Sequence, residues 1–334
     1  MNATVKPEKK HFPVLLNELD SIISPLYSGT FIDCTFGQGG YTNQILKNKN
    51  NKVIALDRDK KTSINVLNFQ NKFKNNFLFK NIKFSKINTL NLENEKLKAV
   101  IFDLGYSTNQ IQDPDKGLSF NSKGKLNMQL GLNEFSAHDV INKLNSKDLE
   151  KIFKYFGEEN KSKIISKKIC QMRKNKIIQT EDLVKIINKI KFNNKSKIHN
   201  STKIFQSLRI FVNNEVSELI YGLINAFNLL PVGGMIVVVS FQSIEDRIVK
   251  YFFKNYSEIK NPSRYLPKRS DEIALFDQVK SKPIVPSKKE KKINPPSRSA
   301  KLRYAIKINK SGDFTEFIKK FQNLLDIENL SKKL

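Results

Sequence analysis

The chain has 334 residues and a formal net charge of +27, and it is long enough to bury a core of ordinary size. Its two cysteines, Cys34 and Cys170, form no CxxC or Cys/His pattern, so the sequence suggests neither a disulfide framework nor a structural zinc site. No apolar run approaches the roughly 20 residues of a membrane span, so we expect a cytosolic protein with a disordered basic arm at residues 1–10.

The positive charge indicates a polyanionic partner, because Lys and Arg neutralise phosphates and release their counterions. The chain is also rich in Lys and Asn and lacks Trp, a composition typical of an AT-rich genome. The total charge is therefore weaker evidence for a polyanionic partner than its size indicates. A local cluster is more informative. Between Lys280 and Arg303 basic side chains surround a single acid, Glu290, and four prolines favour an extended backbone.

Short β-rich runs alternate with helical runs along much of the chain. This alternation predicts an α/β fold with a doubly wound, mostly parallel sheet, whose ligand lies at the carboxyl ends of the strands. The expected strands are 30–36, 52–57, 77–84, 98–104, 235–241 and 302–308, and the first expected helices are 41–48 and 60–71.

The alternation stops for about a hundred residues after Leu104, far more than a crossover between parallel strands needs. Amphipathic runs within 137–190 predict several helices, one capped by Ser146 and another opened by Thr180 and Glu181. We therefore expect an inserted all-helical subdomain. The predicted division is a core of 11–112 and 210–334, a helical RNA-recognition insertion at 113–209, and a basic flexible linker at about 260–296.

The sequence FIDCTFGQGG leads from an apolar run into a glycine loop, which is typical of a nucleotide pocket. Asp57 ends the next strand, where a carboxylate can hold both hydroxyls of a ribose. Thr42 stands where a dinucleotide site needs its third glycine, so the pattern favours S-adenosylmethionine over NAD. An ordinary tight turn is the alternative. The glycines that let the backbone approach the donor are Gly37, Gly39 and Gly40.

A polar loop follows the fourth expected strand, at the predicted donor site. Methyl transfer is an in-line displacement, and an exocyclic amine needs an acceptor for its proton. Asp103 can be that acceptor, it can hold the donor's ammonium group as can Asp33, or it can simply cap the strand. The candidate catalytic residues of this loop are Asp103, Ser107 and Asn109, and Gln110 is a donor-binding candidate.

Several longer motifs occur in a fixed order along the chain: HFPVLLNE, FIDCTFGQGG, ALDRD, DLGYSTNQ with DPDKGLSF, FQSLRIFVNNEV, SFQSIEDRIVK and NPPSRSAKLRYA. Together they resemble the bacterial MraW/RsmH family, the cytosine-N4 methyltransferases of small-subunit (16S) ribosomal RNA. The resemblance runs nearly from end to end.

The resemblance implies a class I, Rossmann-like S-adenosylmethionine methyltransferase that methylates N4 of a cytosine in the decoding (P-site) region of 16S rRNA. Its partner would be this RNA, within the small ribosomal subunit; a homodimer is left open, and no metal or membrane partner is expected. By position the resemblance assigns donor binding to Gly39, Gly40, Tyr41, Asp57, Phe84, Asp103 and Gln110.

Basic and polar side chains that flank the insertion and the linker are candidates for contact with RNA phosphates, with orientation of the Asp103 loop or a solvated charged edge as alternatives. They are Arg209, Asn213, Arg247, Arg298, Lys301 and Arg303. NPPS at 294–297 resembles the NPPY-type loop of amino methyltransferases. Because it follows a lysine-rich linker instead of the fourth strand, we expect it to lie away from the donor.

The chain departs from the family pattern at several polar positions. Tyr41 and Gln242 stand where the family usually has histidine, and Asn127 and Gln129 stand in a segment that usually carries acids and arginines. We favour drift at positions that serve packing. The alternatives are an RNA-binding ribosome-assembly factor with impaired catalysis, a DNA amino methyltransferase, and a nicotinamide oxidoreductase, which Thr42 argues against.

Overall fold

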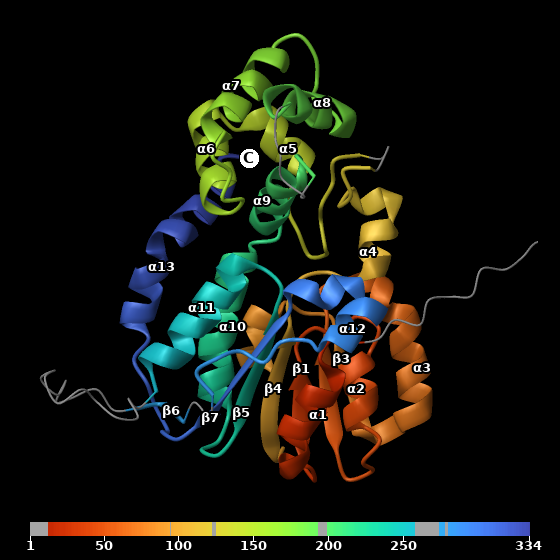
Figure 1. Cartoon of the computed structure of the whole chain (residues 1–334). Coiled ribbons are helices and arrows are strands. Elements are labelled where there is room, and N and C mark those ends of the chain that lie inside the picture. Colours follow the sequence, from red (N-terminus) through yellow and green to blue (C-terminus); the bar gives the residue numbers. More distant parts are fainter. Residues whose placement is uncertain (1–12, 94, 122–124, 193–198, 258–273, 278–279) are drawn as a thin grey trace, which may run out of the picture.

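The computed structural model describes residues 13–334 except 94, 122–124, 193–198, 258–273 and 278–279 (Figure 1). The predicted arm at 1–10 and part of the predicted linker at 260–296 lie outside the described residues. Among the described helices, none combines the length and the apolar character needed to cross a membrane.

The described strands form one seven-stranded sheet in the order β3-β2-β1-β4-β5-β7-β6. Neighbours among β1 to β5 pair in parallel, whereas β7 pairs antiparallel with β5 and with β6. The predicted Rossmann-like class I fold is confirmed. The strands are β1 (Thr30–Asp33), β2 (Lys52–Leu56), β3 (Phe77–Lys80), β4 (Leu97–Asp103), β5 (Met235–Ser240), β6 (Phe276–Asp277) and β7 (Lys301–Lys307).

Both faces of the sheet are covered, because successive side chains of a strand point to opposite faces and nearly all those of the central strands are apolar. Phe31 and Val53 pack with helices α1 to α3 on one face, and Ile32 and Val100 pack with α10, α11 and α13 on the other. The helices are α1 (Leu16–Ile23), α2 (Gly40–Ile45), α3 (Ser63–Phe73), α10 (Glu215–Leu229), α11 (Ser243–Asn255) and α13 (Thr315–Glu328).

The predicted helical insertion is present and lies above the carboxyl ends of the strands (Figure 1). Helix α13 runs from the sheet to the insertion and continues into a 3₁₀ helix (Asn329–Lys333), from which Lys333 Nζ donates to Asp148 Oδ2 at 2.8 Å. The predicted boundary at residue 209 falls inside a helix. The helices after β4 are α4 (Thr108–Gln112), α5 (Ala137–Lys143), α6 (Ser146–Tyr155), α7 (Ser162–Met172), α8 (Thr180–Ile190) and α9 (Thr202–Val212).

Two local predictions were wrong. The cap of α6 is Asn145, whose side chain accepts from Asp148 N at 3.0 Å, and Ser146 is already helical. The backbone predicted to be extended contains α12 (Lys288–Ile293) and a 3₁₀ helix (Pro295–Ser299). Ser287 caps α12 by accepting from Glu290 N at 3.1 Å, and proline is tolerated in the first turn of a helix because no N–H is needed there.

The direction of β7 determines which residues lie at the edge of the sheet where the parallel strands end. Ser240, at the carboxyl end of β5, pairs with Lys301, at the amino end of β7. The parallel strand β4 ends alongside, since Asp103 pairs with Val239. The residues just before Lys301 are therefore delivered to the edge where β4 and β5 end.

Lys307 joins β7 to the end of α10. Its buried Nζ donates to the carbonyl oxygens of Phe227 and Leu230, each at 2.7 Å, and so pairs two of the acceptors that a helix end leaves open. Replacement of Lys307 by Met should lower the free energy of unfolding by about 2 kcal/mol, because both carbonyls lose their donor. Urea denaturation measures this, with exposed Lys310→Met as control; equal midpoints for the two variants would contradict the assigned role.

Candidate active site

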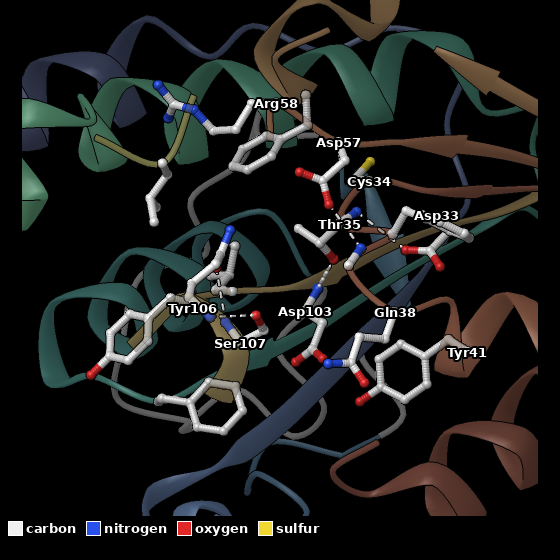
Figure 2. Close-up of a pocket in the computed structure, with 18 of the residues that line it drawn as sticks. Asp33, Cys34, Thr35, Gln38, Tyr41, Asp57, Arg58, Asp103, Tyr106 and Ser107 are labelled. Carbon is white, nitrogen blue, oxygen red and sulfur yellow. Dashed lines mark hydrogen bonds between the residues drawn. The ribbon is translucent and has the colours of Figure 1, made fainter. Parts of the chain in front are cut away.

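A cavity opens at the carboxyl ends of β1, β2, β4 and β5, beneath the insertion (Figure 2). It brings together most of the residues that the sequence predicted for donor binding and catalysis. Gly39 lies beside it, and the side chain of Asn109 is outside the described part of the structure. The predicted residues that line the cavity are Asp33, Gly37, Gly40, Tyr41, Asp57, Phe84, Asp103, Ser107 and Gln110.

The glycine loop between β1 and α2 is required by packing as well as by any ligand. Gly39 has φ 75°, and a Cβ there would lie 2.4 Å from the ring of Phe69. A Cβ on Gly40 would lie 2.1 Å from Pro13. Side chains at either position would push apart the walls that shape the loop.

Asp33 is almost fully buried and holds the loop. Its Oδ1 accepts from Thr35 N at 3.2 Å and its Oδ2 accepts from Thr42 Oγ1 at 2.7 Å. Burial raises the pKa of Asp33 above its usual value, although these hydrogen bonds act to lower it. Thr42, which replaces the third glycine of the dinucleotide pattern, therefore ties α2 to β1.

Asp57 follows β2 and faces the same cavity (Figure 2). Each oxygen accepts one backbone N–H at 2.8 Å, from Gly37 and from Asp59. A carboxylate oxygen has a further lone pair, so both can still accept a hydroxyl of a ligand. Burial raises the pKa of Asp57 to about 6, which leaves it ionised at neutral pH.

Asp103 ends β4 with a carboxylate that lacks a full set of partners. Its Oδ1 is buried and has no hydrogen-bond partner among the described residues, while its backbone N donates to Thr35 Oγ1 at 2.7 Å. Gln38 and Tyr41 lie beside the carboxylate (Figure 2). Burial and the nearby carboxylates of other residues raise the pKa of Asp103 to about 8. A buried acceptor without a donor, facing a cavity, is the group expected to meet a ligand.

Gln110 and Ser107 shape the loop after β4. Gln110 Nε2 donates to Asp59 Oδ2 at 2.8 Å, and its Oε1 accepts from Ser107 N at 3.0 Å. Phe84 opens a 3₁₀ helix after β3 and packs edge-on against Phe102, with ring centroids 5.4 Å apart. These contacts fix the polar and the apolar walls of the cavity.

The prediction that NPPS lies away from the donor site was wrong. Asn294 and Pro296 line the cavity, although about 190 residues separate them from Asp103. The antiparallel pairing of β7 with β5 places them there. The motif NPPS itself pointed to this site. Its position in the chain argued against the site, because the prediction considered only loops that follow parallel strands.

The ionisable groups that line the cavity are mostly acidic. Arg58 is the basic residue among them, and its guanidinium donates to the carbonyls of Gly131 and Asn213 at 2.7 and 2.8 Å. Such a site favours a cation and disfavours a pyrophosphate, which argues against a dinucleotide. The acids are Asp33, Asp57, Asp103, Glu215, Glu218 and Glu245.

Comparison with known proteins agrees with this geometry. The sequence profile of the MraW methylase family matches residues 8–308. The chain belongs to the MraW methylase family. A relative from Rickettsia bellii, named ribosomal RNA small subunit methyltransferase H, is 39% identical over 306 residues, which are 90% of this chain and 100% of the relative. A relative of the same name from Ehrlichia canis is 39% identical over 308 residues, which are 89% and 100% of the two chains.

A solved rRNA methylase from Streptococcus thermophilus aligns over 84% of this chain and 87% of its own, with 11% identity and a TM-score of 0.34. Membership of the MraW methylase family makes the cavity the expected place of a methyl donor.

Three residues predicted to contact RNA are buried in this MraW-family chain. Arg209 is 3% exposed and holds Glu215 through two hydrogen bonds of 2.8 and 2.7 Å, with its guanidinium over the ring of Tyr106. Arg303 is 6% exposed and donates to Asp246 at 2.7 Å. Direct phosphate contact does not fit these side chains, because a buried ion pair is costly to open.

Asn213 is also fully buried. Its Nδ2 donates to Met128 O and its Oδ1 accepts from Leu130 N. Asn213 therefore joins the end of α9 to the segment 128–130. RNA contact does not fit Asn213 either. Arg247 and Arg298 are exposed, and Lys301 is partly exposed while bonded to Asp246 at 2.7 Å, so phosphate contact stays a prediction for these three.

The departures from the family pattern have structural roles. Tyr41 donates its hydroxyl to Val14 O, Gln129 Nε2 donates to Phe135 O at 3.0 Å, and Asn127 Nδ2 donates to Asp115 O at 3.1 Å. The amide of Gln242 lies against the guanidinium of Arg209. These contacts support the interpretation that polar side chains at these positions drift while serving packing. The four substituted residues are Tyr41, Asn127, Gln129 and Gln242.

Proposed function

We propose that this chain is an S-adenosylmethionine-dependent methyltransferase that methylates N4 of a cytosine in the decoding (P-site) region of small-subunit (16S) rRNA. The buried, unpartnered Oδ1 of Asp103 in an acidic cavity is the observation that carries the proposal. A cytosine amine brings the N–H donor that this oxygen lacks. The relatives' name supports ribosomal RNA as the substrate.

The residues present fit the donor. S-adenosylmethionine supplies, when bound, a methyl group on a positively charged sulfur. Asp57 would hold the ribose hydroxyls, Phe84 would pack on the adenine, and the acidic lining would favour the sulfonium and ammonium charges. Gly37 has φ 52° and offers backbone close to the donor.

Asp103 has the central chemical role in this proposal. Its Oδ1 accepts an N–H of the target amine, turns the nitrogen lone pair toward the methyl donor, and takes the proton as the nitrogen is methylated. The surrounding acids oppose the ionised form, which keeps the carboxylate basic enough for this task. Ser107 and Gln110 hold the loop on which the substrate rests.

Exposed basic side chains support RNA as the partner. Arg247 is exposed on the helix after β5 and Arg298 is exposed in the segment before β7, each two residues along the chain from a residue that lines the cavity, Glu245 and Pro296. The insertion stands above the same edge, where it can contact a folded RNA by shape while the target base is unstacked (Figure 1).

A labelled-methyl transfer assay on small ribosomal subunits, free rRNA and duplex DNA tests the proposal. We expect N4-methylcytidine in small-subunit RNA. Label in DNA alone would favour a DNA amino methyltransferase. Absence of transfer, together with no donor binding by calorimetry, would favour an assembly factor without catalysis.

Donor binding is expected to release protons near neutral pH. With a pKa of about 8, Asp103 is mostly protonated at pH 7, and a bound cation lowers that pKa, so the proton leaves. Affinity should therefore rise, by up to about tenfold per pH unit, between pH 6 and 8 and then level off. Calorimetry in buffers of different ionisation enthalpy measures the proton count; zero released protons at pH 7 would contradict the assignment.

A further inference from the structure

Helix α12 carries exposed positive charge beside the cavity. The helix ends one residue before Asn294, which lines the cavity together with the exposed Pro296. Lys288, Lys289 and Lys292 of this helix are exposed, and none of them forms an ion pair with an acid among the described residues. Exposed charges without a partner in the described chain can bind an anionic ligand.

The helix directs its single acid inward and these lysines outward. Successive side chains of a helix are about 100° apart, so Lys288, Lys289 and Lys292 lie within an arc of about 100°. We call these three residues the α12 basic face. Glu290 lies on the other side of the helix, where its half-buried side chain accepts from Leu15 N at 2.9 Å. This acid attaches the helix to the segment before α1 and does not neutralise the lysines.

The attachment through Glu290 fixes the α12 basic face relative to the cavity. Leu15, which donates to Glu290, follows Val14, and the carbonyl of Val14 accepts the hydroxyl of Tyr41. Val14 and Tyr41 both line the cavity. Figure 1 shows α12 over the end of the sheet where the parallel strands finish. The lysines are therefore held beside the opening of the cavity.

The cavity and the α12 basic face carry charges of opposite sign. Most ionisable residues of the cavity lining are acids, such as Asp57 and Asp103, and they oppose the entry of a phosphate. A nucleotide of RNA joins an uncharged base to charged phosphates. The base can enter the acidic cavity while its phosphates remain outside, where a basic surface stabilises them.

We propose that the α12 basic face binds the phosphates of the RNA strand on either side of the target base. The inference rests on the proposed function and names a surface that holds its substrate by the backbone. Contacts between lysines and phosphates position a strand independently of its sequence, so selection of the base falls to the cavity. The α12 basic face should therefore contribute to RNA binding and not to the methyl-transfer step.

A variant with all three lysines replaced by Gln (K288Q, K289Q and K292Q) tests the inference. We expect its affinity for small ribosomal subunits to fall about tenfold or more at low salt. The slope of log K against log salt concentration should shrink by about 2, because each phosphate contact on a single strand contributes about 0.7. In single-turnover methyl transfer, the half-saturating subunit concentration should rise, while the rate at saturation stays within about twofold. Donor affinity should also stay within about twofold, since none of the three lysines lines the cavity.

A matched control removes the same charge from the opposite end of the sheet. Lys47, Lys49 and Lys96 are exposed and lie just before β2 and β4 begin, so their joint replacement by Gln leaves the surroundings of the cavity unchanged. We expect this control to bind small subunits about as tightly as the wild-type chain. Equal affinities for the α12 variant and the control would overturn the inference. Loss of donor affinity in the α12 variant would also overturn it, because the helix would then serve the donor pocket.

Subunit binding is measured independently of methyl transfer, so the two proposals can fail separately. Normal subunit binding by the α12 variant, with methyl transfer by the wild-type chain intact, would refute the inference alone. A wild-type chain that binds subunits through the α12 basic face but transfers no methyl group would refute the proposed function alone.

Discussion

Replacing Asp103 by Asn is expected to lower the rate of methyl transfer by about 10²- to 10⁴-fold at pH 8, because the amide can orient an amine but cannot take its proton. The pH dependence of donor affinity between pH 6 and 8 should become weaker in the same variant, since Asp103 no longer titrates, whereas Glu245, whose pKa burial raises to about 7, still does. Single-turnover transfer to small subunits and calorimetry with the donor measure the two effects.

Asp115→Asn is a suitable control for this variant, because Asp115 is an exposed acid in the same loop region and does not line the cavity. Its rate and its pH dependence should match those of the wild-type chain. An Asp103→Asn variant that transfers methyl groups at the wild-type rate would remove Asp103 from the chemistry.

Replacing Asp57 by Ala is expected to weaken donor binding by about 10²-fold or more. Two hydrogen bonds to a charged group are lost, each contributing about 1.5 kcal/mol or more, and the N–H groups of Gly37 and Asp59 lose their acceptor as well. With a pKa of about 6, Asp57 also predicts that donor affinity falls in the wild-type chain as the pH drops below 6.

Asp57→Asn provides the comparison, since it keeps the shape of the side chain but not its charge. We expect its donor affinity to lie between those of the Ala variant and the wild-type chain. In both variants the transfer rate at saturating donor should fall less than the donor affinity does. Unchanged affinity in Asp57→Ala, measured by calorimetry, would refute the assignment to the ribose.

Much of the fold could be predicted because its signals are local. The apolar runs that became β1 to β5 and β7 are short and bounded by turn residues, and the loop from Gly37 to Gly40 directly follows one of them. Parallel strands then bring Asp57 and Asp103 to one edge of the sheet without further information. That these residues line one cavity was therefore predictable from the sequence.

The wall that contains Asn294 and Pro296 was not predictable in this way, because it depends on a reversed strand. Only the antiparallel pairing of β7 with β5 delivers Asn294 to the edge where Asp103 lies. The burial of two arginines was equally unpredictable from the sequence. Arg209 and Arg303 are buried by acids that lie six and 57 residues away in sequence, and the spacing of charges gives no sign of the second pairing.

Nucleoside mass spectrometry of small-subunit RNA tests the central claim most directly. Small subunits from cells that lack this gene are incubated with the purified chain and a donor that carries an isotopically labelled methyl group, and the RNA is then digested and mapped. We predict labelled N4-methylcytidine at a single cytosine of the decoding region. A labelled methyl group on another base or another atom, or none at all with the donor bound, would contradict the account.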